Sequence, residues 1–182
     1  MYRIPIESHI FKSTLVQMIK IGFTGSELWQ SADGNDIRPY GNFVIDRENK
    51  RLYAFTMRDQ ERKTRFFEFD MPKHGDGKYA PEFDLPVVTL SELDVRAWFD
   101  SEYINFMQGA AYHDGCIYST EGFTNSVRNP ALRVFDVKEK KQVLHVDLRD
   151  LGLHIEAEFV DVYNGETYYI DSAGDAFKIS FT

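Results

Sequence analysis

Cysteine is nearly absent from this chain of 182 residues, which limits how the fold can be stabilised. The single cysteine, Cys116, excludes a disulfide within the chain, so stability must come from noncovalent packing. Cys116 lies inside an apolar run, where a thiol is more often a small buried hydrophobe than a nucleophile. We therefore expect an inert, buried side chain at this position.

Long apolar runs and a basic excess are also missing. No stretch approaches the ~20 apolar residues of a transmembrane helix, and the N-terminal residues 1–7 have neither the apolar core nor the cleavage site of a signal peptide. We expect no membrane span or export signal in this chain and leave the compartment open, since an upstream segment could have carried a signal. The net charge of −8 and the isoelectric point near 5.1 argue against a nucleic-acid partner.

Motifs for nucleophilic, phosphate and metal chemistry are lacking too. No serine stands in Gly-x-Ser-x-Gly, and Gly22-Phe-Thr-Gly25 is not followed by the Lys-Ser/Thr of a phosphate-binding loop. The five histidines show no zinc-ligand spacing, and the Asp-x-Asp-x-Asp-Gly pattern of a calcium loop is absent. We therefore expect no cofactor and no metal.

The chain contains one strand-turn-strand sequence motif that is repeated three times. The copies are Phe43-Val-Ile-Asp-Arg-Glu-Asn-Lys-Arg-Leu-Tyr53, Gly109-Ala-Ala-Tyr-His-Asp-Gly-Cys-Ile-Tyr118 and Phe159-Val-Asp-Val-Tyr-Asn-Gly-Glu-Thr-Tyr-Tyr169. Each joins two apolar runs by a polar turn, and aromatic residues, which favour strands, make up 15% of the chain. The copies recur near the ~40–50 residues of a four-stranded blade once residues 72–100 are removed. The repeat predicts modular antiparallel sheets.

Further elements are expected between these hairpins. Residues 14–23 read as one strand and residues 24–42 as irregular chain. Residues 64–70 read as a strand with Phe67 and Phe69 on one face and Phe66 on the other. Prolines indicate a loop over 72–88. Thr89 and Glu92 at capping-box spacing, followed by an apolar stripe, indicate a helix over 89–100.

Together these elements predict an all-β, antiparallel, propeller-like fold of about three and a half to four blades with one inserted helix. We divide it into a partial blade and loop (1–42), a blade with the inserted loop and helix (43–105), and two further blades (106–150 and 151–182). A propeller with an open ring leaves bare strand edges. We therefore expect a shortened form of a longer propeller, or a subunit that completes its ring by association through open blade edges.

Residues of the second repeat carry a resemblance to a known family. Phe106-Met-Gln-Gly-Ala110, Gly115-Cys-Ile-Tyr-Ser-Thr-Glu-Gly122 and Leu132-Arg-Val-Phe-Asp136 are similar to one blade of the plant-type glutaminyl-peptide cyclotransferases. Two features depart from that pattern. Ser-Thr precedes Glu121 instead of following a glutamate, and after Glu156 the chain has Ala157 where the family has a glycine. With Arg38-Pro-Tyr-Gly41 and the expected 89–100 helix in matching order, the chain from Tyr2 onward also resembles the C-terminal part of uncharacterised bacterial six-bladed propeller proteins. This resemblance implies a fold and no activity.

The polar residues expected at the central channel are Gln108, Glu121, Glu156 and Glu158. Carboxylates in a partly desolvated channel can act as general acids or bases. The alternative is that these side chains cap strands or bond neighbouring blades.

We expect a binding or scaffold module for a peptide, glycan or protein partner. The alternative is a cyclotransferase-like or hydrolase-type enzyme that uses the channel carboxylates. A third possibility is a chain without independent function that pairs its open edges.

Overall fold

The computed structural model describes residues 2–3, 14–20, 37–58, 61–90, 93–104, 107–124 and 129–180. These residues form an all-β structure with no α-helix, and a 3₁₀ turn, η2, lies at Leu148–Leu151. Within the described part, no helix is long and apolar enough to cross a membrane.

Three sheets, which we name the first, second and third, are antiparallel meanders whose strands pair in chain order. The first contains β4 (Ile37–Asp46), β5 (Arg51–Arg58), β6 (Lys63–Asp70) and β9 (Ala97–Glu102). The second contains β10 (Met107–His113), β11 (Cys116–Glu121), β12 (Ala131–Asp136) and β13 (Lys141–Asp147). The third contains β14 (Ala157–Tyr163), β15 (Glu166–Asp171) and β16 (Ala176–Ile179). The three predicted hairpins are therefore confirmed as β4–β5, β10–β11 and β14–β15.

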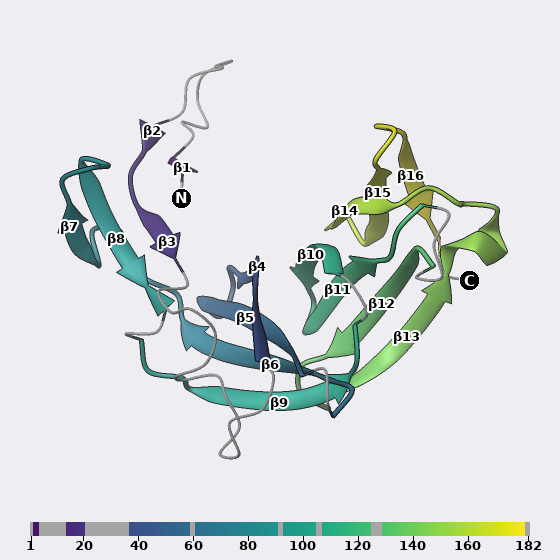
Figure 1. The fold of residues 1–182 in the computed structure, drawn as a ribbon, viewed down its shortest axis with the longest axis horizontal. Coiled ribbons are helices and arrows are strands. Elements are labelled where there is room, and N and C mark those ends of the chain that lie inside the picture. Colours follow the sequence, from purple (N-terminus) through teal and green to yellow (C-terminus); the bar gives the residue numbers. More distant parts are fainter. Residues whose placement is uncertain are drawn as a thin grey trace.

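A fourth sheet, the side sheet, has the order β3-β8-β7 and lies at one end of the structure (Figure 1). Its strands are β3 (Met18–Lys20), β7 (Lys78–Ala80) and β8 (Leu85–Thr89), and β3 pairs with β8 in parallel. Two shorter strands, β1 (Tyr2–Arg3) and β2 (Thr14–Leu15), pair with each other.

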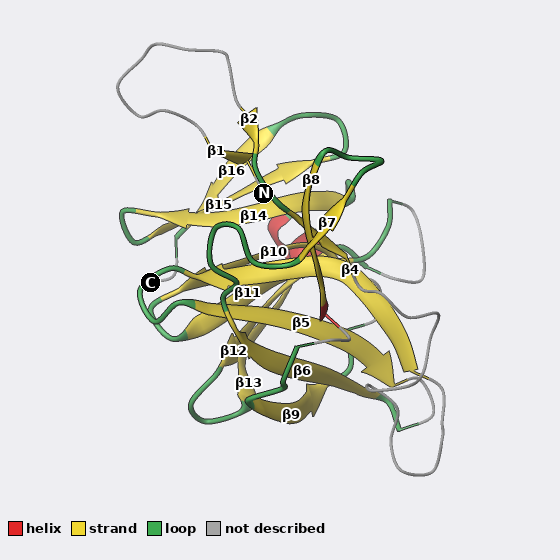
Figure 2. Ribbon diagram, turned by 90° about the vertical axis from the view of Figure 1, so that its left-hand side faces the viewer, coloured by secondary structure: helices red, strands yellow, loops and turns green. Residues whose placement is uncertain are grey.

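The sheets follow one another along an arc, with β4, β10 and β14 on its inner side and β9 and β13 on its outer side (Figure 1). The side sheet and the third sheet stand at opposite ends, and Figure 2 shows the same sheets after a turn of 90° about the vertical axis. On the inner side, β10 contacts both β4 and β14. The first strand of each meander is thus the one nearest the centre of the arc.

Alternating side chains hold the neighbouring sheets together. Because successive residues of a strand point to opposite faces, Phe66 packs toward the second sheet while Phe67 and Phe69 pack toward the side sheet, as predicted. Phe66 contacts Phe135 of β12 at a ring-centroid distance of 5.0 Å. A third cluster joins the second and third sheets through Leu132, Val160, Tyr169 and their neighbours. Each of these three clusters lies between two sheet faces.

Short turns place the strands in register. Asp114 and Gly115 both have positive φ (45° and 78°), as do Asn164 and Gly165 (53° and 76°), which is the two-residue turn whose twist suits a hairpin. The longer β4–β5 turn is organised by Asp46, whose Oδ1 accepts from the backbone N–H of Asn49 at 3.0 Å. The Asn/Asp-Gly signal in the sequence therefore corresponds to real turns.

The predicted helix over 89–100 is wrong. Residues up to Thr89 belong to β8, and residues from Ala97 belong to β9, which pairs with β6; residues 91–92 lie outside the described part. Over β9 the buried residues alternate, with Phe99 and Ser101 covered and Trp98 exposed. This alternation is that of a strand, and β9 forms backbone hydrogen bonds with the otherwise open edge of β6. The pairing between strands outweighs the local preference of the capping residues for a helix.

Two boundaries also differ from the predictions. The predicted loop over 72–88 contains the β7–β8 hairpin. Pro86 has no backbone N–H to donate, but it lies outside the part of β8 that pairs with β3, so no hydrogen bond to β3 is lost there. Strand β4 begins at Ile37, within the stretch expected to be irregular, and an irregular register between Pro39 and Phe43 interrupts its pairing. Residues 21–36 lie outside the described part.

Replacing Phe66 tests the packing between the first and second sheets. Phe66 is fully buried and contacts the rings of Phe55 (5.5 Å), Phe99 (4.9 Å) and Phe135 (5.0 Å). We expect Phe66→Ala to lower the free energy of unfolding by about 3–5 kcal/mol in urea titrations. The control is Phe83→Ala, because Phe83 is half-exposed and should contribute less than about 1 kcal/mol. Equal losses for the two variants would contradict this account of the core.

Candidate functional site

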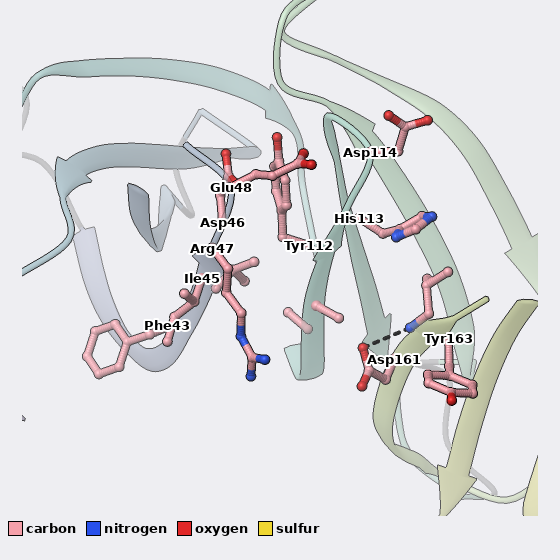
Figure 3. Close-up of a pocket in the computed structure, with 14 residues that line it drawn as sticks. Phe43, Ile45, Asp46, Arg47, Glu48, Tyr112, His113, Asp114, Asp161 and Tyr163 are labelled. Atoms are coloured by element: carbon pink, nitrogen blue, oxygen red, sulfur yellow. Dashed lines mark hydrogen bonds between the residues drawn. The ribbon is translucent and has the colours of Figure 1, made fainter. Parts of the chain in front are cut away.

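A hollow of about 780 Å³ opens where β4, β10 and β14 meet their hairpin turns (Figure 3). We call it the central hollow. Its lining comes from all three inner strands and their turns: Phe43, Val44, Ile45, Asp46, Arg47, Glu48, Ala110, Ala111, Tyr112, His113, Asp114, Asp161, Val162 and Tyr163. Pockets of this volume are of the size that takes small ligands or peptide side chains.

Repetition brings these residues together. Asp46 to Glu48, Tyr112 to Asp114, and Asp161 to Tyr163 all lie within two residues of the end of the first strand, which falls at Asp46, His113 and Tyr163. Since the first strand of each of these sheets faces the centre of the arc, the three strand ends converge there (Figure 1). The small side chains of Ala110 and Ala111 leave the space open between them.

Close approach of two inner strands depends on Gly109. A Cβ built on this glycine would lie 2.8 Å from the carbonyl oxygen of Glu158 and 2.8 Å from the Cα of Phe159. Atoms at that distance overlap, so any side chain there would push β10 and β14 apart. Gly109 therefore permits the close spacing of the inner strands β10 and β14.

Asp46 is the buried carboxylate of the hollow, with 1% of its surface exposed. Burial disfavours its charge, but hydrogen bonds from Asn49 and from the Tyr112 hydroxyl outweigh burial and hold the pKa of Asp46 below its usual value. Burial, followed by the Asp46 charge, raises the pKa of Tyr112 to about 12. Tyr112 also stacks on Tyr53, with ring centroids 5.8 Å apart. Because the pKa of Asp46 is lowered and that of Tyr112 is raised, the carboxylate stays ionised and the phenol stays protonated near neutrality.

The predicted residues Gln108 and Glu156 lie at the other ends of the inner strands. The Gln108 side-chain amide donates to the Glu156 carboxylate and, at 3.3 Å, to the Gly122 carbonyl oxygen. Burial, and then the charge of Glu158, raise the pKa of Glu156, while a hydrogen bond to Thr124 partly offsets that rise. Gln108 and Glu156 are thus joined by a hydrogen bond, and Glu158 acts on Glu156 through its charge.

Glu121 has a different environment. It is 4% exposed and forms an ion pair with Arg133 at 2.8 Å, and His145 Nε2 lies 4.0 Å from its carboxylate. Arg133 also donates to Gln142 at 2.7 Å. Burial, and then the neighbouring Arg133 charge, lower the pKa of His145. Glu121 and Arg133 thus join β11 to β12 through charge-assisted hydrogen bonds, and the Arg133–Gln142 bond extends the link to β13.

The residues of the central hollow were not among those predicted from the sequence. The signal was present, because each of the three repeats has an aspartate within two residues of the end of its first strand: Asp46, Asp114 and Asp161. Within the described residues, no group of histidine, cysteine, aspartate or glutamate side chains is arranged to hold a metal ion.

Comparisons with known proteins find little. No family model and no curated protein match the chain. Among solved structures, the crystal structure of the computationally designed Ika4 protein aligns with 88% of this chain and 99% of its own, at 7% identity and a TM-score of 0.37. A similarity this low does not assign the chain to a fold family.

The pKa of Asp46 leads to a test by pH. A carboxyl whose folded pKa is lowered stabilises the fold above its unfolded value of about 3.9, and that stabilisation is lost as the pH falls through the folded value. We expect Asp46→Asn to cost about 1–3 kcal/mol at pH 7 and to flatten the loss of stability below about pH 4. Urea titrations across this range measure both effects.

The control for this test is Asp114→Asn, which makes the same change of charge in an exposed turn. It should leave the pH dependence close to that of the unmodified chain. The interpretation is wrong if both variants follow the same curve.

Proposed function

We propose that the first, second and third sheets are blades of a β-propeller-like arrangement. Two observations support this: all three are meanders in chain order, and each has its first strand on the inner side of the arc. Face-to-face packing of successive sheets around a centre is the packing that propeller blades use.

On this arrangement we propose a binding module that takes an extended, positively charged peptide in the central hollow. The observation that carries the proposal is the convergence of three inner strands on one concavity of about 780 Å³. The inner ends of blades are where a propeller can present side chains from several sheets to one ligand.

The charges of the central hollow favour a cationic ligand. Asp46 is engaged by Asn49 and Tyr112, which leaves Glu48, Asp114 and Asp161 as exposed carboxylates. Arg47 is the permanent cation among the lining residues. Tyr163, 68% exposed, adds an aromatic face on which a lysine or arginine side chain can pack.

Backbone geometry favours an extended peptide over a compact ligand. His113 and Cys116 close the two-residue β10–β11 turn, so the N–H and C=O groups of Ala110 and Tyr112 point away from β11 toward the centre of the arc. The equivalent N–H in β14, that of Val162, is taken by Asp161 Oδ1 at 2.8 Å (Figure 3). An extended chain can pair with the inner edge of β10 while its side chains enter the hollow.

Peptide titration tests this proposal. We expect acetyl-Gly-Lys-Gly-Lys-Gly-amide to bind at least about tenfold more tightly than its glutamate counterpart in NMR or calorimetric titrations, and more weakly as salt is raised. Tyr163→Ala should weaken binding about fivefold or more. Tyr79→Ala removes a similarly exposed tyrosine from the side sheet and should have no effect. Absence of saturable binding by either peptide would contradict the proposal.

A second candidate function is supported by the group around Glu156. Its raised pKa and its hydrogen bond to Gln108 suit a general acid-base role, and Gln108 lies in the stretch that resembles the cyclotransferase blade.

The test of this candidate is release of ammonia from an N-terminal glutaminyl peptide. We expect Glu156→Gln to lower kcat by about 10²-fold or more. Glu166→Gln, which changes an exposed carboxylate paired with Lys178, should leave kcat unchanged. The candidate is excluded if the unmodified protein releases no ammonia from the peptide, or if the two variants have the same kcat.

A further inference from the structure

The third sheet differs from its neighbours by one strand. The first and second sheets each cover their third strand with a fourth, β9 and β13, whereas among the described residues the third sheet ends at β16. The consequence appears in burial: β6 and β12 are almost wholly covered, but Ala176 and Lys178 of β16 are exposed. The outer edge of β16 is therefore the position where the other sheets continue.

Register tells which backbone groups of β16 face outward. Asp171 N–H donates to the Asp175 carbonyl oxygen at 3.1 Å, and pairing then runs through Tyr169↔Phe177 and Thr167↔Ile179. Because hydrogen-bonded pairs alternate along an antiparallel ladder, Phe177 and Ile179 bond to β15. The N–H and C=O groups of Ala176 and Lys178 point away from β15 toward the outer edge.

We propose that this edge pairs with the same edge of a second copy of the chain, antiparallel about a two-fold axis at Phe177. The outward groups at 176 and 178 then form the two hydrogen-bonded pairs Ala176↔Lys178 and Lys178↔Ala176 across the axis, and the two third sheets become one six-stranded sheet. Edge pairing of this kind satisfies backbone groups that otherwise bond only to water.

Charge selects this register and favours a second copy as the occupant. If the two-fold axis lay at Lys178 instead of Phe177, Lys178 would face Lys178 of the other copy. Like charges directly opposite each other are unfavourable. In the proposed register each lysine faces an alanine, and its ammonium keeps the ion pair with Glu166 of its own chain at 2.8 Å.

Aromatic side chains favour the same axis. Phe177 is stacked on Tyr169 at 4.9 Å, on the face that packs toward the second sheet. Two Phe177 side chains facing each other as a non-hydrogen-bonded pair continue this stack across the axis. Cross-strand aromatic pairs are among those that stabilise sheets.

The decisive comparison is between Lys178→Pro and Lys178→Ala. Both remove the ammonium that pairs with Glu166 at 2.8 Å, but only proline removes the outward N–H, which no bond to β15 uses. Sedimentation of the unmodified chain over a concentration series should show a monomer–dimer equilibrium. Lys178→Pro should weaken it about tenfold or more, because it removes two of the four pairing hydrogen bonds, while Lys178→Ala should change it less than about threefold.

Ala176→Pro, which also removes an outward N–H, repeats the test if Lys178→Pro does not fold. Thermal unfolding of each variant confirms that the fold is kept. An unmodified chain that stays monomeric at every concentration overturns the proposal. A dimer that survives both proline substitutions also overturns it, since its interface must then lie elsewhere.

Discussion

The structure depends on sheet faces that pack against sheet faces. Phe66 shows the principle: it is fully buried, lies in the third strand of its sheet and contacts Phe135 of the next sheet. Burial of such rings is the largest favourable contribution that a chain without disulfides can obtain. The same arrangement recurs between the first sheet and the side sheet, and between the second and third sheets. This packing between sheet faces is what holds the inner strands of the three sheets next to one another.

The central hollow follows from this packing and from the repeat. Each hairpin ends its first strand with a polar turn, and packing brings three such ends to one place. Gly109 permits β10 to approach β14 closely. Asp46 and Tyr112 then form a wall in which a buried carboxylate remains ionised because its hydrogen bonds outweigh its burial. Neither the hollow nor its charge belongs to any single sheet.

Much of the fold could be predicted from the sequence, because its turns are locally determined. Asp114-Gly115 and Asn164-Gly165 adopt the positive φ values that their residue types favour, and the faces of β6 follow from simple alternation. The helix over 89–100 was predicted wrongly because the capping signal at Thr89 is local, whereas pairing of β9 with β6 joins residues 29 (Glu68↔Ala97) to 39 (Lys63↔Glu102) positions apart.

The candidate site was harder to predict for a related reason. Gln108 and Glu156 were predicted, and their contact joins β10 to the segment that leads into β14. Glu121 was expected at the channel, but its nearest partners are Arg133 and His145, and no sequence pattern indicates that pairing. Residues such as Tyr163 and Asp161 become candidates only when the three repeats are placed around a common centre.

The central claim is that face-to-face packing makes the three sheets one cooperative unit that holds the hollow. Native-state hydrogen exchange of the backbone amides in β5, β11 and β15 tests it most directly. If the claim holds, the slowest amides of the three strands exchange with the same free energy of opening and the same dependence on denaturant. Opening of β15 at a much lower free energy, with its own denaturant dependence, would contradict it.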